Sequence, residues 1–164
     1  TATMWYHDHG MDITAHNVNR GLAGFFLMTD DLERQLIDDK ILPYGDAPYD
    51  ISGYGQCDIP LALSDKRLNN AGEIQYDFLE HNGQLGNIMT VNGRAQPYLR
   101  VQRKKYRFRI LGVGMARVWA VRLSQGQFTV IGNDSWLVPE AFKERIIVLG
   151  PAQRAYLFVV FIRF

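Results

Sequence analysis

The residues best suited to chemistry in this sequence are two histidines that flank one aspartate, in the stretch Met4-Trp5-Tyr6-His7-Asp8-His9-Gly10. In an extended strand, residues two positions apart share a face, so His7 and His9 would present both imidazoles to the same space. Neutral imidazole binds copper, zinc, iron and nickel, and the lack of nearby thiolates and clustered carboxylates favours copper or zinc. The pattern therefore predicts a metal site, although a bare His-x-His also recurs by chance on partly solvated strands.

The other two histidines and the single cysteine are weaker candidates. We expect a structural or surface role for His16, with metal ligation as its secondary role. His81 lies in the turn-like stretch Glu80–Gly83 and should be a solvated loop residue. One cysteine, Cys57, excludes an intrachain disulfide and every zinc or iron–sulfur site that needs cysteine pairs. No histidine adjoins Cys57, so we expect it to be a small core residue.

Composition and charge exclude several classes of partner. The chain has 164 residues, of which 47% are hydrophobic, and its 18 basic and 17 acidic side chains leave a net charge of +1. No overall field therefore draws it to nucleic acid or to anionic lipid. It has no apolar run long enough to span a membrane, and Thr1–Trp5 resemble the interior of a strand more than a signal peptide. We expect neither a nucleic-acid nor a membrane partner, and the compartment stays open.

The pattern of apolar and turn residues predicts an all-β chain. Gly21–Thr29 is an aromatic-rich apolar run that predicts a buried strand, and residues 31–39 have the spacing of one short helix. Residues 43–56 are rich in proline, glycine and tyrosine, which is typical of a linker. After the linker we expect strands at Asp58–Ser64, Ile88–Val91, Tyr98–Val101, Lys105–Leu111, Arg117–Leu123, Phe128–Ile131, Arg145–Leu149 and Ala155–Phe161. No long helical period follows residue 58, which favours an antiparallel β-sandwich over an α/β fold.

Strict alternation is clearest in Lys105–Ile110. Successive side chains of a strand point to opposite faces, so Tyr106, Phe108 and Ile110 should face the core. The basic side chains between them should then lie on a solvated face. This reading explains the run without invoking a nucleic-acid patch.

The sequence around the two histidines resembles the second His-x-His block of multicopper oxidases, most nearly that of bilirubin oxidases and bacterial spore-coat-type laccases. The resemblance covers nearly the whole chain in the right order. It is carried by Thr3–His9, Met11–Ala15, Asn19–Gly24, Gly53–Gly55, Asp58–Leu61, Val91–Gly93, Lys105–Arg109 and Asn133–Ser135. It implies a cupredoxin-like Greek-key β-sandwich and a copper-dependent oxidoreductase that oxidises phenols, polyphenols, aromatic amines or tetrapyrroles while reducing O2 to water.

The resemblance also implies roles for individual residues. His7 and His9 would bind the type 3 copper pair of a trinuclear cluster, one ligand to each ion. The Asp8 carboxylate would tune a ligand histidine without itself contacting the metal, or would simply be solvated. Trp5 and Tyr6 would pack around the cluster and exclude water.

The chain departs from the family pattern because it has no further His-x-His pair and no His-Cys-His motif, so the blue-copper ligands are absent. We expect residues 1–32 to be the last strands of a first cupredoxin domain, 33–57 a linker, and 58–164 most of a second domain. Both domains would then lack strands and expose apolar faces, which predicts a homo-oligomer or a self-associating chain. The parent protein would be secreted, periplasmic or part of a spore coat.

Two other readings are possible from the residues alone. The chain could be a non-catalytic cupredoxin-like binding or structural module with at most one adventitious metal ion. It could also carry a mononuclear zinc or copper site with hydrolytic or superoxide chemistry.

Overall fold

The computed structural model describes residues 1–43 and 57–161. Most of the predicted linker, residues 44–56, therefore lies outside the described residues. The helices are α1 (Thr14–Asn19) and α2 (Asp31–Asp38). The strands are β1 (Ala2–His7), β2 (Ala23–Met28), β3 (Asp58–Lys66), β4 (Ile88–Val91), β5 (Arg94–Ala95), β6 (Lys105–Gly112), β7 (Trp119–Arg122), β8 (Phe128–Gly132), β9 (Leu137–Glu144), β10 (Ile146–Leu149) and β11 (Arg154–Val160).

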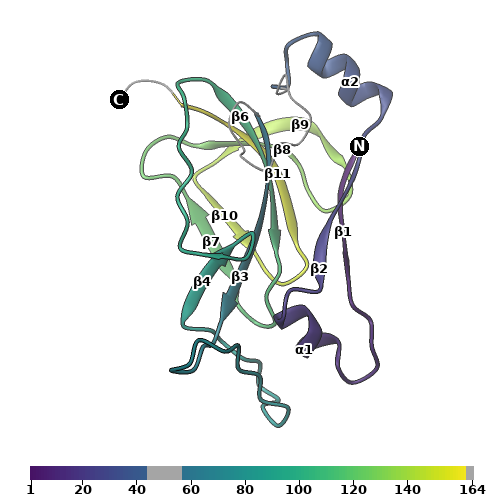
Figure 1. The fold of residues 1–164 in the computed structure, drawn as a ribbon. Helices are drawn as coiled ribbons and strands as arrows, with labels where there is room; N and C mark the ends of the chain where they lie inside the picture. Colours follow the sequence, from purple (N-terminus) through teal and green to yellow (C-terminus); the bar gives the residue numbers. More distant parts are fainter. Residues whose placement is uncertain (44–56, 162–164) are drawn as a thin grey trace.

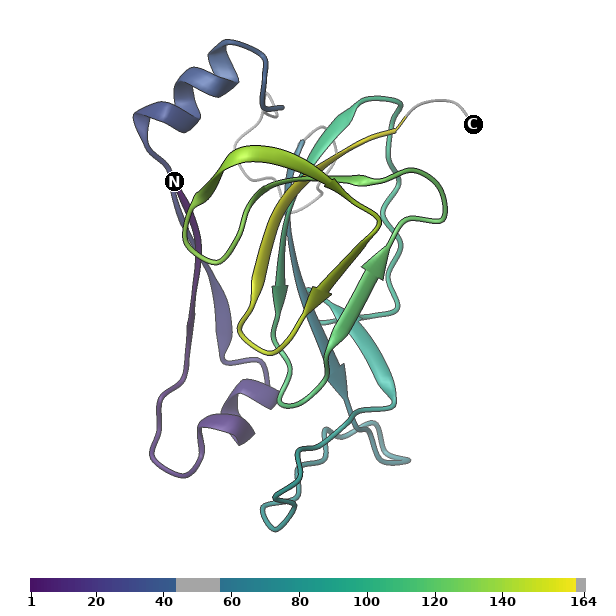
Figure 2. The same cartoon turned by 180° about the vertical axis from the view of Figure 1, so that it is seen from behind.

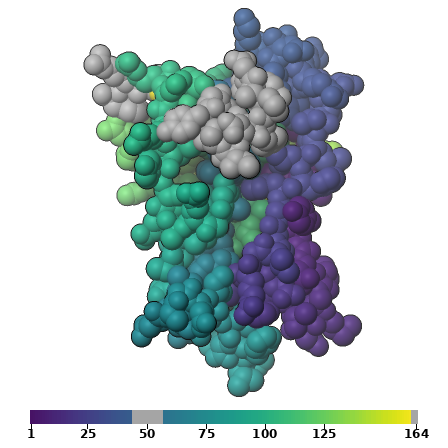
Figure 3. Space-filling view, in the orientation of Figure 1, coloured from purple at the N-terminus to yellow at the C-terminus, as the bar shows by residue number. Residues whose placement is uncertain are grey.

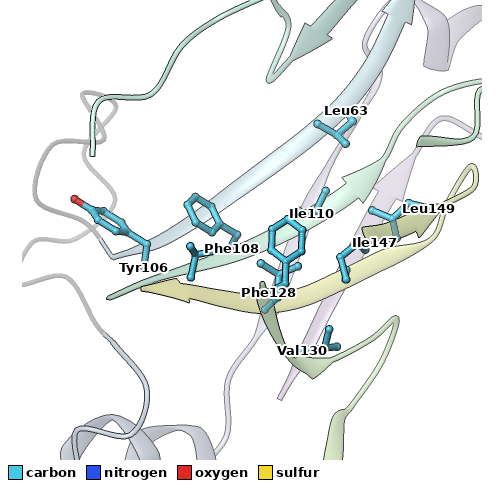
Figure 4. Close-up of a cluster of buried hydrophobic side chains, with 11 residues drawn as sticks. Leu63, Tyr106, Phe108, Ile110, Phe128, Val130, Ile147 and Leu149 are labelled. Carbon is cyan, nitrogen blue, oxygen red and sulfur yellow. The ribbon is translucent and has the colours of Figure 1, made fainter. Parts of the chain in front are cut away.

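The body of the molecule is a β-sandwich. One sheet has the strand order β5-β4-β3-β6-β11-β8-β9, in which β3 and β6 are parallel and the other neighbours antiparallel. Strands β7 and β10 form a separate antiparallel pair on one side of it (Figures 1 and 2). Figure 4 shows the core between these layers, where apolar side chains of β6 and β8 approach those of β10. The predicted all-β sandwich is confirmed.

An N-terminal hairpin lies beside this sandwich. Strands β1 and β2 pair antiparallel, from Ala2 opposite Met28 to His7 opposite Ala23, and α1 lies in the connection between them. One face of the hairpin packs through Trp5 and Phe25 on an apolar cluster at the end of β6. The other face is open, and Phe26 and Met28 are half exposed. The prediction that Gly21–Thr29 is a buried strand is therefore wrong for one of its two faces.

The two faces of β6 are both covered, against expectation. Tyr106, Phe108 and Ile110 face the core as predicted. Arg107 and Arg109, predicted to be solvated, are each only 1% exposed. The hairpin and α2 cover this second face of the sheet, and acidic side chains from distant segments pair with the two arginines.

Other predicted elements differ at their boundaries or in kind. The predicted helix is confirmed as α2, and its N-cap Asp30 accepts a hydrogen bond from Glu33 N at 2.8 Å. The strand predicted at Tyr98–Val101 is wrong, because these exposed residues pair with no strand. Strand β9 was not predicted, since its polar sequence contains a proline and lies at the sheet edge, where proline is tolerated. Neither helix of the described residues has the length and apolar character needed to cross a membrane.

Candidate metal centre at the end of strand β1

The two imidazoles lie side by side where β1 ends. The rings of His7 and His9 are stacked with centroids 5.4 Å apart and an angle of 27° between their planes. Trp5 extends the same stack, with its ring 4.6 Å from that of His7. The prediction that these alternate residues share a face is confirmed, and no apolar side chain separates the two imidazoles.

A hydrogen bond selects the nitrogen that His7 can offer to a metal. His7 Nδ1 lies 2.6 Å from the backbone carbonyl oxygen of Asp8. A carbonyl only accepts, so Nδ1 must carry the proton and donate, which leaves the lone pair of neutral His7 on Nε2. His7 is half-buried and His9 is exposed. The pair therefore presents at least one oriented nitrogen to an accessible space.

Asp8 organises the turn that follows the stack. Its Oδ2 accepts hydrogen bonds from Asn17 Nδ2 at 2.9 Å and from Gly10 N at 3.0 Å. These bonds, that from Asn17 first, lower the pKa of the Asp8 carboxyl. Asp8 therefore fixes the backbone that carries His9, and the structure shows no contact between its carboxylate and an imidazole nitrogen.

The two aromatic neighbours differ. Trp5 is half-buried and joins His7 to the apolar cluster beneath the hairpin. Tyr6 points to the opposite face, is 62% exposed, and lies over Gly24, where a Cβ atom would stand 2.6 Å from its hydroxyl oxygen. Of these two aromatic side chains, only Trp5 contacts the imidazole pair.

The weaker candidates lie in other surroundings. His16 packs against Tyr76 and Phe78, with ring centroids 5.3 and 5.2 Å away. His81 is exposed and Cys57 is buried, as predicted. Within residues 1–43 and 57–161, no three histidine, cysteine, aspartate or glutamate side chains are grouped so as to hold a metal ion. The described part of the chain thus supplies a pair of ligands and not a complete coordination sphere.

A buried ionic cluster, which was not predicted, anchors the other end of β1. Glu33 Oε1 accepts hydrogen bonds from Arg107 Nη1 and Arg109 Nη2, each at 2.7 Å, and from the Tyr156 hydroxyl at 3.2 Å. Asp58 accepts from both arginines at 2.6–3.1 Å. Burial opposes ionisation of Glu33, but Arg109, the hydrogen bond from the Thr1 hydroxyl and Arg107 together outweigh it and hold the pKa of this carboxyl below its usual value. Burial also raises the pKa of Tyr156.

The cluster reaches β1 through Thr3. Arg109 Nη1 donates to Thr3 Oγ1 at 3.3 Å, and Arg154 Nε donates to the Thr3 carbonyl at 2.9 Å. Strand β1 is thus fastened at Thr3 and presents the imidazoles of His7 and His9 at its far end. The alternation of arginines with apolar residues in β6 was the only sequence feature that could have indicated this ionic cluster. It did not reveal the acidic partners of Arg107 and Arg109, which lie 49 to 76 positions away in sequence.

Comparison with known proteins finds relatives among oxidases and cell division proteins. No family model matches the chain. It is 34% identical to a bilirubin oxidase of Albifimbria verrucaria, 38% to the cell division protein FtsP of Xenorhabdus nematophila, and 32% to a laccase of Bacillus subtilis. Each alignment covers 93% of this chain but only 26–30% of the relative. The chain therefore spans less than a third of the length of these relatives.

Solved structures agree with the sequence relatives. The multicopper oxidase McoA of Aquifex aeolicus superposes with a TM-score of 0.82 at 33% identity, over 96% of this chain and 33% of that one. A laccase of Pediococcus acidilactici gives a TM-score of 0.84 at 31% identity, over 98% and 32%. The predicted cupredoxin-like fold is confirmed by these neighbours.

Proposed function

Because this chain belongs to the multicopper oxidase family, we propose that His7 and His9 are two of the copper ligands of an oxidase that transfers electrons from an organic donor to O2. The donor would be a phenol, an aromatic amine or a tetrapyrrole, consistent with relatives named laccase and bilirubin oxidase. The stacked imidazole pair at the end of β1 is the observation that supports this function.

The donor set fits copper. Imidazole nitrogen is a preferred ligand of copper, and the hydrogen bond from Nδ1 to the Asp8 carbonyl leaves Nε2 of His7 for the metal. We propose that each imidazole binds one ion of a type 3 pair. Copper, when bound, supplies the one-electron chemistry that passes electrons to O2.

The chain's own contribution is to hold and shield these ligands. Trp5 stacks on His7 and keeps one side of that ring out of water. Asp8 fixes the turn through Gly10 and Asn17, and so limits where His9 can move. Such pre-organisation lowers the cost of ordering the ligands when a metal binds.

Two histidines cannot complete a trinuclear cluster, so the remaining ligands must come from outside the His7–His9 pair. We propose that they come from further polypeptide or from a second copy of this chain. The half-exposed apolar face of the hairpin, with Tyr6, Phe26 and Met28, supports association. A secreted, periplasmic or spore-coat location stays a prediction from the resemblance.

The test is copper content together with oxygen consumption. We expect His7→Ala and His9→Ala each to abolish stoichiometric copper, measured by mass spectrometry, and O2 uptake with a phenolic donor. His81→Ala is the matched control, because this exposed loop histidine should leave both unchanged. His16→Ala tests the secondary ligand. Unchanged copper content in both the His7 and His9 variants would refute the proposal.

The relatives named cell division protein FtsP favour a second candidate. One is 38% identical over the same span, more than the bilirubin oxidase or the laccase. A non-catalytic cupredoxin-like module would bind at most one adventitious ion and consume no O2.

A mononuclear zinc or copper site would be distinguished by the electron paramagnetic resonance of the copper-loaded protein.

A further inference from the structure

A cleft separates the N-terminal hairpin from the sandwich. Its volume is about 360 Å³, within the range of small-molecule sites. Helix α1 and strand β2 form one wall, and β3 and β4 form the other. Figure 3 shows a hollow between the N-terminal segment, in purple, and the strands in teal. Apolar side chains on its walls are Val18, Ala23, Phe25, Ala62 and Val113.

Alternation along β3 gives this cleft a polar end. Ala62, Ser64 and Lys66 line the cleft, whereas Asp65 points to the opposite face of the strand. Thr90, which lies opposite Ser64 on β4, also lines it and donates its hydroxyl to the Ser64 carbonyl at 3.0 Å. The cleft is therefore apolar over most of its walls and carries one cation beside two hydroxyl side chains.

The Lys66 ammonium has no anionic partner among the described residues. Its Nζ donates to the carbonyl oxygen of Asn19 at 2.5 Å, which engages one of its three N–H groups. The adjacent carboxylate, Asp65, is engaged by Arg117 Nε at 2.8 Å and by Gly86 N. Burial lowers the pKa of Lys66. Within the described part of the chain this half-buried ammonium makes no ion pair, although the charge of Asp65 attracts it, and two of its N–H groups are left for an anion in the apolar cleft.

We propose that this cleft binds a small carboxylic acid with an aromatic or aliphatic body. The carboxylate accepts hydrogen bonds from Lys66 Nζ, and the body packs against Phe25 and Val113. A charge-assisted hydrogen bond supplies the anion specificity, and the apolar walls supply the remaining affinity. Neither His7 nor His9 lines the cleft, and the proposed binding requires no metal.

Calorimetric titration of the full chain with benzoate, in the presence of a chelator, tests the proposal. Benzoate should bind saturably at one site per chain. Benzyl alcohol has the same ring and no charge, and should bind about tenfold more weakly or worse. Lys66→Met should weaken benzoate binding to a similar extent, and Lys66→Arg should restore part of it. Lys143→Met, on the exposed face of β9, is the control and should bind like the native chain.

A second variant separates loss of binding from loss of folding. Ala62→Leu fills the cleft while Lys66 stays in place, and should abolish benzoate binding with an unchanged circular dichroism spectrum. The proposal is overturned if benzoate does not bind, if benzyl alcohol binds equally well, or if the folded Lys66→Met and Ala62→Leu proteins bind as the native chain does.

Discussion

The two ends of β1 hold their polar side chains in opposite ways. Near Thr3, the ionic cluster draws residues from α2, β3, β6 and β11, and it is almost sealed from water. At the other end, the imidazole pair contacts Trp5 and the Asp8 backbone, its neighbours in sequence. Near Thr3, polar contacts with distant segments fix the strand. At the imidazole pair, contacts with sequence neighbours leave imidazole nitrogens available to a metal. Stability and metal binding should therefore respond to different mutations.

The largest expected loss of stability comes from disrupting the buried ionic cluster. Glu33→Ala should lower the free energy of unfolding by about 3–5 kcal/mol, because it leaves two buried guanidiniums with one carboxylate fewer. Urea denaturation at pH 7 measures this. Arg34→Ala, on the same helix, removes an exposed ion pair with Asp31 and should change stability by no more than about 0.5 kcal/mol. Equal losses in the two variants would contradict a special role for the buried cluster.

A smaller loss should follow from replacing a guanidinium by an ammonium. Arg109→Lys keeps the charge but cannot reach Glu33, Asp58 and Thr3 at once, since lysine lacks the planar fork. We expect a loss of about 1.5–3 kcal/mol in the same denaturation experiment. Arg122→Lys, on an exposed position of β7, is the control and should be nearly neutral. A neutral Arg109→Lys would show that charge alone holds the cluster.

The cluster should also make stability depend on pH. The pKa of Glu33 is lower in the folded chain than in the unfolded chain, so its stabilisation is complete above the unfolded value of about 4.3. It is lost as the pH falls through the folded pKa, because the unfolded chain then binds more protons. The stability difference between the native chain and Glu33→Gln should narrow from pH 7 to pH 3. If the stability difference between the two proteins stays constant over this pH range, folding does not lower the pKa of Glu33.

The smallest effect on stability is expected at the imidazole pair. His9 is exposed, and His9→Ala should change the free energy of unfolding by no more than about 0.5 kcal/mol. His7→Ala should cost about 1 kcal/mol, because it removes a hydrogen bond and the stack on Trp5. Both should lose copper. A His9→Ala protein with a much lower free energy of unfolding than the native chain would contradict the proposed difference between the two ends of β1.

The same contrast explains what could be predicted from sequence. Strand periodicity predicted the shared face of His7 and His9, although β1 ends at His7 and His9 lies in the segment that follows. The core face of β6 with Phe108 and Ile110 follows from the same periodicity. These are local properties of the chain. The burial of Arg107 and Arg109 could not be predicted, because it depends on Glu33 and Asp58, which come from remote segments.

Edges and irregular segments were also difficult to predict. Strand β9 has exposed polar residues and a proline, so neither alternation nor strand propensity identified it. Tyr98–Val101 has the composition of a strand but no partner strand beside it in the sheet. Pairing, and not local preference, decides such segments. The proposed copper and the proposed electron donor rest on relatives, since two histidines alone fit several metals.

The hydrogen bond from Arg154 to Thr3 joins residues 151 positions apart, which has a consequence for the order of folding. During synthesis, β1 leaves the ribosome long before β11 exists, and loop closure over that distance must wait. Strand β1, which ends at His7, can acquire its final anchor only after Arg154 has been made. If His7 and His9 bind copper as proposed, ions captured earlier would meet a loosely held pair, and productive metal loading should follow translation.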